Sequence, residues 1–206
     1  MFYSIARFIV TPIMHLLIKV RYEGQENLKE NGGYILCSNH RAWWDPILVA
    51  FGIRKRHINF MAKKELFKFK PFGVIIRALG AFPINRGTAD SGAIKTAEDI
   101  LNSGKILLIF PEGTRSKTGT PLRAKSGAAY IAHETGADII PVAICYEGKY
   151  CIRKKVTVCY GQPIKSDEIV IQKENKSADA KKAMNLVFGR IVDMLNAHMG
   201  TNYTVK

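Results

Sequence analysis

The stretch Ile106-Leu107-Leu108-Ile109-Phe110 is an unbroken apolar run between two turns. Gly104 stands just before it and Pro111-Glu112-Gly113 follows it, and residues of these types mark the ends of regular elements. Because successive side chains of a strand point to opposite faces, a strand that is apolar at every position is buried on both faces. The run therefore predicts a central strand of a parallel sheet covered by helices.

Strands and helices alternate on either side of this run. Other apolar runs predict strands at residues 34–38, 58–62, 81–84, 139–145 and 156–160. The spacing of apolar residues predicts helices at 88–103, 126–134 and 177–199, and Asp45-Pro46 opens another helix with Asp45 as its N-cap. This alternation predicts an α/β fold, with a mostly parallel central sheet flanked by helices on both faces. Ligands of such sheets bind outside the carboxyl ends of the strands.

The composition indicates one domain with anionic partners. The 206 residues, 47% of them hydrophobic, suffice for one substantial core. Lysine and arginine total 31 against 17 acidic residues, a formal charge of +14, which favours phospholipid head groups, phosphorylated substrates, acidic carrier proteins or nucleic acid as partners. Many of these bases lie in residues 54–70 between apolar side chains, which favours an interfacial segment over a merely solvated face.

The four cysteines lack the CxxC spacing of a metal or redox motif: Cys37, Cys145, Cys151 and Cys159. Three of them lie in or beside predicted strands, so we expect buried, reduced thiols in a cytosolic chain. The spacing predicts no metal site.

Residues 1–20 have the pattern of an amphipathic helix. Their polar members recur every three or four positions: Ser4, Arg7, Thr11, His15 and Lys19. Charges interrupt the run too often for a membrane span, and the pattern does not fit a signal peptide. We expect a helix at a membrane interface, kinked or split at Pro12, and a helix packed on the protein's own core is the alternative.

The segment Asn39-His40-Arg41-Ala42-Trp43-Trp44-Asp45-Pro46 carries the chief catalytic candidates, His40 and Asp45. On a continuous helix, a separation of five positions would turn the two side chains about 140 degrees apart. A turn that ends at a helix beginning with Asp45 can instead fold the carboxylate back to the imidazole, fixing its tautomer. Because no serine or cysteine nucleophile stands at a suggestive place, we assign His40 as the general base that deprotonates an acceptor hydroxyl. The competing interpretation is that His40 satisfies the loop and Asp45 caps the helix.

A second loop, Glu112-Gly113-Thr114-Arg115, follows the central run. Glycine lets backbone N–H groups approach an anion closely, and arginine binds phosphate through two parallel hydrogen bonds. Arg86, just after the predicted strand 81–84, supplies a second guanidinium group. Both loops leave carboxyl ends of predicted strands, so we expect them at one site, with Glu112 orienting an arginine or binding a substrate hydroxyl.

In order and spacing these segments resemble the 1-acylglycerol-3-phosphate acyltransferase family of glycerolipid synthesis, over about residues 32–163. Residues 40–45 match the family's first motif, a histidine and an aspartate separated by four residues. Residues 82–87 resemble its second, arginine-bearing block, 110–116 match its third, and 140–142 resemble its fourth. The resemblance implies that His40 is the catalytic base and Asp45 its partner. It further implies a glycerol phosphate site made of Arg86, Glu112, Gly113, Thr114 and Arg115, and Lys63, Lys64 and Lys125 are added candidates for contacts with substrate or membrane.

The resemblance also implies the reaction. A fatty acyl group would pass from an acyl thioester, acyl-CoA or acyl carrier protein, to the 2-hydroxyl of lysophosphatidate, giving phosphatidate without a covalent intermediate, a metal or a redox cofactor. We expect a docking segment at residues 1–24, an acyltransferase domain at 25–206, and peripheral or monotopic binding to anionic lipid at the cytoplasmic face of the cell membrane. No cleaved signal peptide is expected.

Three alternatives stay open on the sequence. The acceptor is glycerol-3-phosphate or another lysophospholipid in the first, and the chain is a noncatalytic membrane-surface scaffold in the second. The third, a basic module that binds nucleic acid, would explain the charge, but the chain has no helix-turn-helix, zinc or RNA-binding sheet signature and the two loops would have no purpose. We therefore expect no nucleic acid partner.

Overall fold

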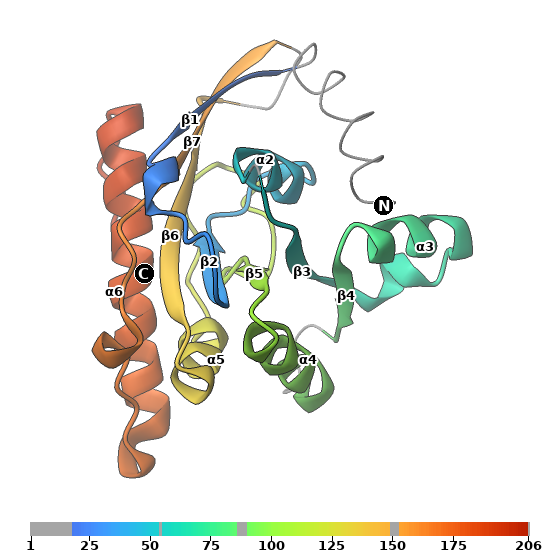
Figure 1. Cartoon of the computed structure of the whole chain (residues 1–206). Coiled ribbons are helices and arrows are strands. Elements are labelled where there is room, and N and C mark those ends of the chain that lie inside the picture. The colour runs from blue at the N-terminus through green and yellow to red at the C-terminus, as the bar shows by residue number, and fades with distance from the viewer. Residues whose placement is uncertain (1–17, 54, 86–89, 149–152, 206) are drawn as a thin grey trace.

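The computed structural model describes residues 18–53, 55–85, 90–148 and 153–205. They form a seven-stranded sheet in the order β1-β7-β6-β2-β5-β3-β4 (Figure 1). The strands are β1 (Ile18–Glu23), β2 (Tyr34–Ser38), β3 (Ile58–Lys63), β4 (Ala81–Ile84), β5 (Ile106–Ile109), β6 (Asp138–Cys145) and β7 (Lys154–Tyr160). β6, β2, β5, β3 and β4 are parallel to one another, while β7 pairs antiparallel with β6 and parallel with β1. The predicted mostly parallel sheet is confirmed.

Helices cover both faces of the sheet, as predicted. The helices are α2 (Asp45–Gly52), α3 (Lys70–Ala78), α4 (Ser91–Asn102), α5 (Gly127–Thr135) and α6 (Lys176–Met199). Short 3-10 turns lie at Gln25–Asn27, Lys64–Phe67, Ser166–Glu168 and Lys173–Asn175. Residues of α4, α5 and α6 share one apolar core with one face of the sheet, and α2 packs against the opposite face (Figure 1).

The centre of the sheet is β2, which lies between β5 and β6. Leu36 pairs with Leu108 of β5 and with Ile140 of β6, and all three side chains are fully buried. This explains why the run at residues 106–110 is apolar at every position. Since β2, β5, β3 and β4 are parallel, the chain leaves all of them at the same edge, where the candidate site residues follow.

The expected helix over residues 1–20 is wrong in its last part. Residues 1–17 lie outside the described residues, whereas Ile18–Glu23 forms β1 and pairs along its whole length with β7. Ile18, Val20 and Tyr22 pack into the core, and Lys19 and Arg21 are exposed. That period of two is a strand signal, but the helical spacing upstream runs on into it. The expected boundary after residue 24 is also corrected, because β1 belongs to the same sheet as the rest.

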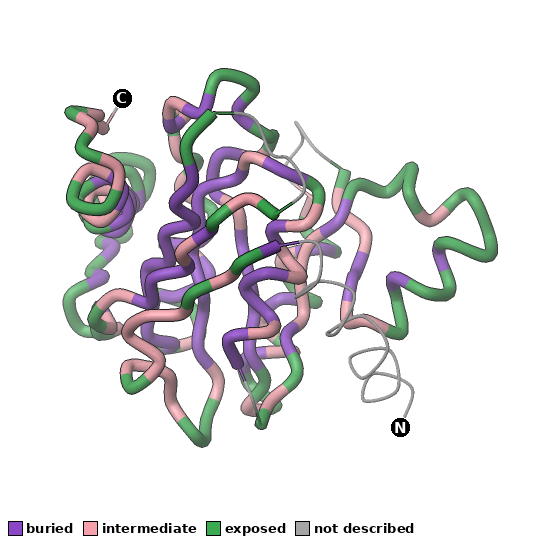
Figure 2. The backbone as a smooth tube through the Cα atoms, turned by 90° about the horizontal axis from the view of Figure 1, so that it is seen from above, coloured by how far each residue is buried: buried purple, intermediate pink, exposed green. Residues whose placement is uncertain are grey.

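The helix α3 was not predicted. Pro71 stands in its first turn, Gly73 and Ile76 face inward, and most of its other residues are exposed. Ile76 packs with Ala62 and Ala81 in a small core at the β3–β4 end of the sheet. Figure 2 shows this segment as an exposed arm at the side of the buried sheet. It is only nine residues long, and it contains Pro71 and Gly73, which mark turns more often than helices in a sequence.

The start of β2 depends on a close contact at Gly33. A Cβ atom there would lie 2.2 Å from the carbonyl oxygen of Leu101 in the last turn of α4. We expect Gly33→Ala to lower the free energy of unfolding by about 1–3 kcal/mol or more, since a backbone carbonyl cannot move aside as a flexible side chain can. For a protein of this size that is a fall in Tm of about 2–4 °C per kcal/mol, measurable by thermal unfolding.

Gly127→Ala is the matched control. Gly127 is the first residue of α5, and an added Cβ would meet no atom within 4 Å. The Tm of this variant should equal that of the wild type or rise slightly, since alanine lowers the conformational entropy of the unfolded chain. An equal Tm for the two variants would show that α4 does not press on β2 in this way.

Candidate active site

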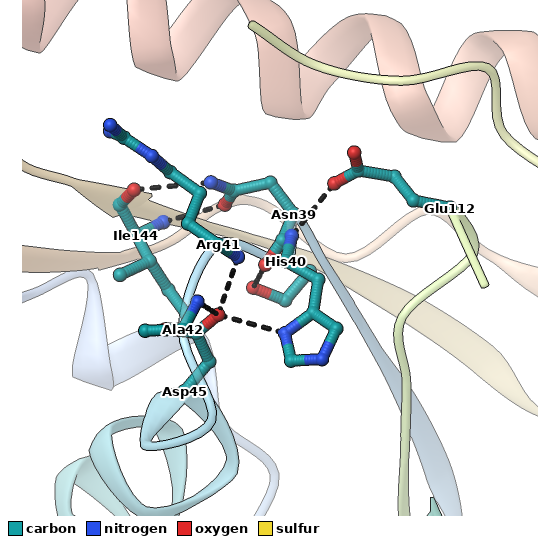
Figure 3. Close-up of polar contacts among 8 residues, drawn as sticks. Asn39, His40, Arg41, Ala42, Asp45, Glu112 and Ile144 are labelled. Carbon is teal, nitrogen blue, oxygen red and sulfur yellow. Dashed lines mark hydrogen bonds and ion pairs between the residues drawn. The ribbon is translucent and has the colours of Figure 1, made fainter. Parts of the chain in front are cut away.

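The loop between β2 and α2 is built around the carboxylate of Asp45 (Figure 3). Its Oδ2 atom accepts hydrogen bonds from the backbone N–H groups of Arg41 at 2.7 Å and Ala42 at 2.8 Å. The same oxygen lies 2.8 Å from Nδ1 of His40, so the predicted contact between imidazole and carboxylate is present. The side chain of Asp45 is fully buried, and these three bonds to Oδ2 offset part of its desolvation, while Oδ1 has no hydrogen-bond partner among the described residues.

The predicted capping role of Asp45 needs a correction. The helix α2 begins at Asp45 itself, with Trp44 as its N-cap residue and Pro46 in the first turn. The carboxylate does not cap the helix that follows. It turns back and holds the loop that precedes it, which is why His40 can reach it.

The ring of His40 is held at one face and at one nitrogen. One face stacks on the ring of Phe110, with 4.1 Å between ring centroids and 24° between planes. The residue is 8% exposed, and Nδ1 is bonded to Asp45. A carboxylate on Nδ1 favours the tautomer whose proton is on Nδ1, and this leaves the lone pair of Nε2 for a substrate proton. The side chain thus has the geometry of a general base.

Glu112 joins the two predicted site loops. Its Oε1 atom accepts a 2.7 Å hydrogen bond from the backbone N–H of His40, and its Oε2 atom accepts one of 2.8 Å from the N–H of Leu122. The backbone N–H of Ser116 also donates to the carbonyl oxygen of His40 at 2.8 Å. The segments around 40 and 112 therefore form one unit, as the sequence predicted from their places after two strands.

This geometry corrects the role expected for Glu112. The carboxylate is 4% exposed and both oxygens face backbone N–H groups, so it does not present itself to a phosphate or to Arg115. Burial raises the pKa of Glu112 to about 7, and the bonds from Leu122 and His40 offset part of that rise. We assign Glu112 as the residue that positions His40.

The rest of the second loop faces outward. Gly113 has a φ of +69°, a left-handed conformation that suits glycine, and a Cβ there would lie 3.1 Å from Nζ of Lys125. Thr114 and Arg115 are exposed. The bond from Ser116 to His40 puts the loop of Gly113, Thr114 and Arg115 next to the His40 loop, and Lys125 lies next to Gly113. Arg86 lies outside the described residues.

Two residues that hold the site were missed from the sequence. The side-chain amide of Asn39 donates to the carbonyl of Ile144 at 3.1 Å and accepts from its N–H at 2.8 Å, which ties the loop to β6. Arg41 donates to the carbonyls of Tyr146 at 2.5 Å and Gly148 at 3.0 Å, and its guanidinium lies over the Tyr146 ring. Asparagine and arginine are common on surfaces, so nothing in their spacing revealed these partners.

The remaining basic residues lie farther out. Lys63 and Lys64, at the end of β3, are exposed, and Lys63 pairs with Glu65 at 3.4 Å. A basic pocket at the amino ends of β3 and β5 lies at the opposite edge of the sheet and includes Arg56. Arg56 donates to the carbonyls of Lys29, Gly32 and Gly104, so it joins loops there and belongs to no site with His40.

The fold is an α/β fold with a mostly parallel sheet, and a histidine and carboxylate pair lies at the carboxyl edge of that sheet beside a glycine-containing loop. This combination is that of an α/β enzyme. The profile of the Acyltransferase family matches residues 19–145, more than half of the chain. The chain belongs to this family.

Similar proteins agree with this assignment. The chain is 35% identical over 177 residues to the 1-acyl-sn-glycerol-3-phosphate acyltransferase of Streptococcus pneumoniae, covering 82% of this chain and 65% of that protein. It is 34% identical to the protein of the same name from Bacillus subtilis, covering 84% of this chain and 88% of that one. The crystal structure of the 1-acyl-sn-glycerophosphate (LPA) acyltransferase PlsC from Thermotoga maritima superposes with a TM-score of 0.68 at 25% identity, covering 94% and 79% of the two chains.

We expect Glu112→Gln to change how stability depends on pH. The pKa of Glu112 is raised from 4.5 to about 7 in the folded state, so above pH 4.5 the folded protein binds more protons than the unfolded one. The contribution of Glu112 to the free energy of unfolding is on the order of 3 kcal/mol. It is fully present below the pKa of the unfolded chain and is lost as pH rises through 7. The variant keeps the shape and cannot titrate.

Urea unfolding of both proteins between about pH 4.5 and 8 measures this. The free energy of unfolding of the wild type should fall relative to that of the variant as pH rises, and the difference isolates Glu112 from the other acids. Parallel curves for the two proteins would mean that Glu112 does not titrate in this range.

Proposed function

We propose that this chain transfers a fatty acyl group from an acyl thioester to the 2-hydroxyl of 1-acyl-sn-glycerol-3-phosphate, producing phosphatidate for phospholipid synthesis. The observation that carries the proposal is the 2.8 Å contact between Nδ1 of His40 and Oδ2 of Asp45 beside the outward-facing loop of Gly113, Thr114 and Arg115. The names of the similar proteins support this acceptor. The donor, acyl-CoA or acyl carrier protein, is the co-substrate, and the mechanism uses no other cofactor.

His40 acts as the general base in a single displacement. Its Nε2 takes the proton of the acceptor hydroxyl as the oxygen attacks the thioester carbonyl, and Asp45 stabilises the imidazolium that forms. The C–S bond then breaks, and the departing thiolate takes the proton from the imidazolium to leave as the free thiol. Base assistance of this kind is worth about 10²- to 10⁴-fold in rate.

The phosphate of the acceptor is held by the second loop. Arg115 offers a planar guanidinium for two hydrogen bonds, Thr114 offers a hydroxyl, and the amine of Lys125 lies next to Gly113. Arg86 completes the set in this proposal, on the strength of the resemblance of its segment to the family's second block. The arrangement keeps the anion a short distance from His40 because Ser116, in the same loop, bonds to the His40 carbonyl.

A kinetic comparison of His40→Ala and Arg115→Ala tests the assignment. His40→Ala should lower kcat by about 10²-fold or more while lysophosphatidate still binds, because only the base is removed. Arg115→Ala should act mainly by raising KM for lysophosphatidate, because phosphate binding is used in the ground state as well. Initial rates of thiol release, with acyl-CoA and acyl carrier protein donors in parallel, measure both.

Arg190→Ala is the control, since Arg190 is an exposed arginine on α6. Its kinetic constants should equal those of the wild type. Wild-type turnover in His40→Ala would refute the mechanism, and faster turnover of glycerol-3-phosphate or of another lysophospholipid than of lysophosphatidate would move the acceptor assignment to that compound.

We also propose that the protein docks on anionic membrane through the α3 surface, defined as residues 64–78. This surface holds five of the large hydrophobic side chains that stand exposed in the described residues: Leu66, Phe69, Phe72, Val74 and Ile75. Phe69 and Val74 are 69% and 66% exposed, and Lys64, Lys68 and Lys70 stand among them. Exposed apolar side chains and lysines in one segment suit the boundary between the acyl chains and the acidic head groups of a membrane.

The docking proposal places the protein peripherally at the cytoplasmic face of the cell membrane. Across the ranges that the structure describes, no helix combines the length and the hydropathy that crossing a bilayer requires. The expected docking role of residues 1–17 lies outside those ranges and stays a prediction. An apolar docking surface next to β3 and β4 would bring a lipid substrate to the edge of the sheet where His40 lies.

We expect the double variant Phe69→Ser/Val74→Ser to bind vesicles at least about 10-fold more weakly, because each fully buried side chain of this kind contributes about 1.5–3 kcal/mol. Vesicles of phosphatidylglycerol and phosphatidylcholine, sedimented with the protein, measure the partition coefficient. Lys68→Gln/Lys70→Gln should weaken binding to the anionic vesicles alone, by about 1 kcal/mol per lysine at low salt.

Val170→Ser/Leu186→Ser is the matched control, since both residues are exposed and apolar but lie away from α3. Its partition coefficient should equal that of the wild type. If the control loses as much binding as the α3 variant, or neither loses any, the α3 surface is not the docking site.

A further inference from the structure

Two buried cysteines and a histidine meet on the face of the sheet covered by α6. Cys145 ends β6, Cys159 lies in the neighbouring strand β7, and His198 lies in the last turn of α6. Their two sulfurs and one ring nitrogen all lie within 4.8 Å of one another. Nε2 of His198 is 3.3 Å from Sγ of Cys159. No other residues in the described ranges bring three such ligand atoms together.

A carboxylate that could supply a fourth donor lies beside His198 on the edge strand, outside the group of three ligand atoms. Oε2 of Glu23, at the end of β1, lies 2.9 Å from Nε2 of His198, while its Oε1 pairs with Arg21. The cysteines are buried at 5% and 4% exposure, whereas the side chains of Glu23 and His198 are about one third exposed, at 34% and 30%. The three-atom cluster is therefore closed on the side of the cysteines and open to solvent at His198 and Glu23.

The histidine is oriented as a metal ligand. Nδ1 of His198 lies 2.9 Å from the carbonyl oxygen of Met194, one turn earlier in α6. A carbonyl and a carboxylate can only accept, so Nδ1 donates to Met194 and Nε2 donates to Glu23. A metal ion would replace the proton on Nε2, while the Nδ1 proton would stay hydrogen-bonded to the carbonyl. A backbone carbonyl on the distal nitrogen is the usual means by which proteins orient a metal-bound imidazole.

The spacing also suits a tetrahedral ion. Zinc bonds of about 2.3 Å to sulfur and 2.0–2.1 Å to nitrogen place these two ligand atoms about 3.6 Å apart. The sulfur and nitrogen of Cys159 and His198 are 3.3 Å apart, so small side-chain adjustments would admit the ion. Two thiolates, one imidazole and one carboxylate form a donor set that zinc accepts and that magnesium and calcium do not favour.

We propose that Cys145, Cys159, His198 and Glu23 form a Zn²⁺ site that joins the end of α6 and β1 to the β6–β7 pair. The expectation of no metal from the sequence rested on the spacing of cysteines along the chain. The site instead takes its ligands from four separate elements, which only the sheet brings together. The metal site is distinct from the His40 and Asp45 site. If no metal binds, the proposed acyl transfer is unaffected.

Hydrogen bonds connect the metal site to the loop that carries His40. Ile144, the residue before Cys145, exchanges two hydrogen bonds with Asn39, and Asn39 precedes His40. An ion bound at Cys145 would therefore fix the end of the strand that anchors the catalytic loop. Zinc should raise the Tm, since a ligand that binds only the folded state stabilises it.

Titration of the metal-free, reduced, full-length chain with Co²⁺ and then Zn²⁺ tests the proposal. We expect one equivalent of Co²⁺ to give thiolate-to-cobalt charge-transfer absorption and tetrahedral d–d bands, and Zn²⁺ to displace it. Cys145→Ser and Cys159→Ser should each lower Zn²⁺ affinity by at least about 100-fold, because loss of an outer partner alone costs 10- to 100-fold. His198→Asn and Glu23→Gln, at partly exposed positions, test the site with less risk to folding.

Two matched controls separate the site from general thiol and imidazole binding. Cys37→Ser removes a buried free thiol of β2 that lies outside the cluster. His133→Asn removes an exposed histidine whose Nδ1 also faces a backbone carbonyl, that of Ile169. Both should bind Zn²⁺ like the wild type, and both should show the same rise in Tm.

Three results would overturn the proposal. One is a wild-type titration with no thiolate-to-cobalt band. Another is equal Zn²⁺ affinity in Cys145→Ser, Cys159→Ser, His198→Asn and the wild type. The third is a Cys145–Cys159 disulfide in protein isolated without reductant, seen as the loss of two hydrogen masses in the linked peptides and regained on reduction, with no metal bound after reduction.

Discussion

The buried carboxylate of Asp45 is the constraint on which the active loop depends. A charged group with no exposed surface is stable only when hydrogen bonds replace its water, and here the backbone N–H groups of Arg41 and Ala42 and the ring of His40 do so on one oxygen. Satisfying that oxygen curls the loop, and the curl directs the imidazole. The same interaction that lets the chain bury an acid therefore gives His40 the geometry of a general base.

A second buried acid links this loop to the rest of the site. Glu112 spans the backbone of His40 and Leu122, so a segment that follows β5 holds a segment that follows β2. The link is possible because β2 and β5 are adjacent and parallel, with Leu36 opposite Leu108. Phe110, the residue after β5, then lies against the His40 ring. Both carboxylates hold His40 through its backbone and its ring, and Thr114 and Arg115 of the second loop are exposed.

The order of the strands also determines which surfaces lie on either side of the site. At one side, β3 and β4 carry the α3 surface, where apolar and basic side chains face outward together. At the other side, β6 turns the direction of the sheet through its antiparallel pairing with β7, and β7 in turn carries β1 and the cysteine and histidine cluster under α6.

The sequence by itself determined the α/β class, the central strands and the pairing of His40 with Asp45, because these follow from local signals: unbroken apolar runs, a proline at a helix start, and two motif loops after strands. It did not determine β1, whose alternation is short and continues a helical pattern upstream, nor α3, which is only nine residues long and contains Pro71 and Gly73. The partners of Glu112, Asn39 and Arg41 were decided only by the tertiary structure, since they are backbone groups far away in the chain. The same holds for the cluster of Cys145, Cys159 and His198: strand order and helix packing, which no local spacing encodes, bring its members together.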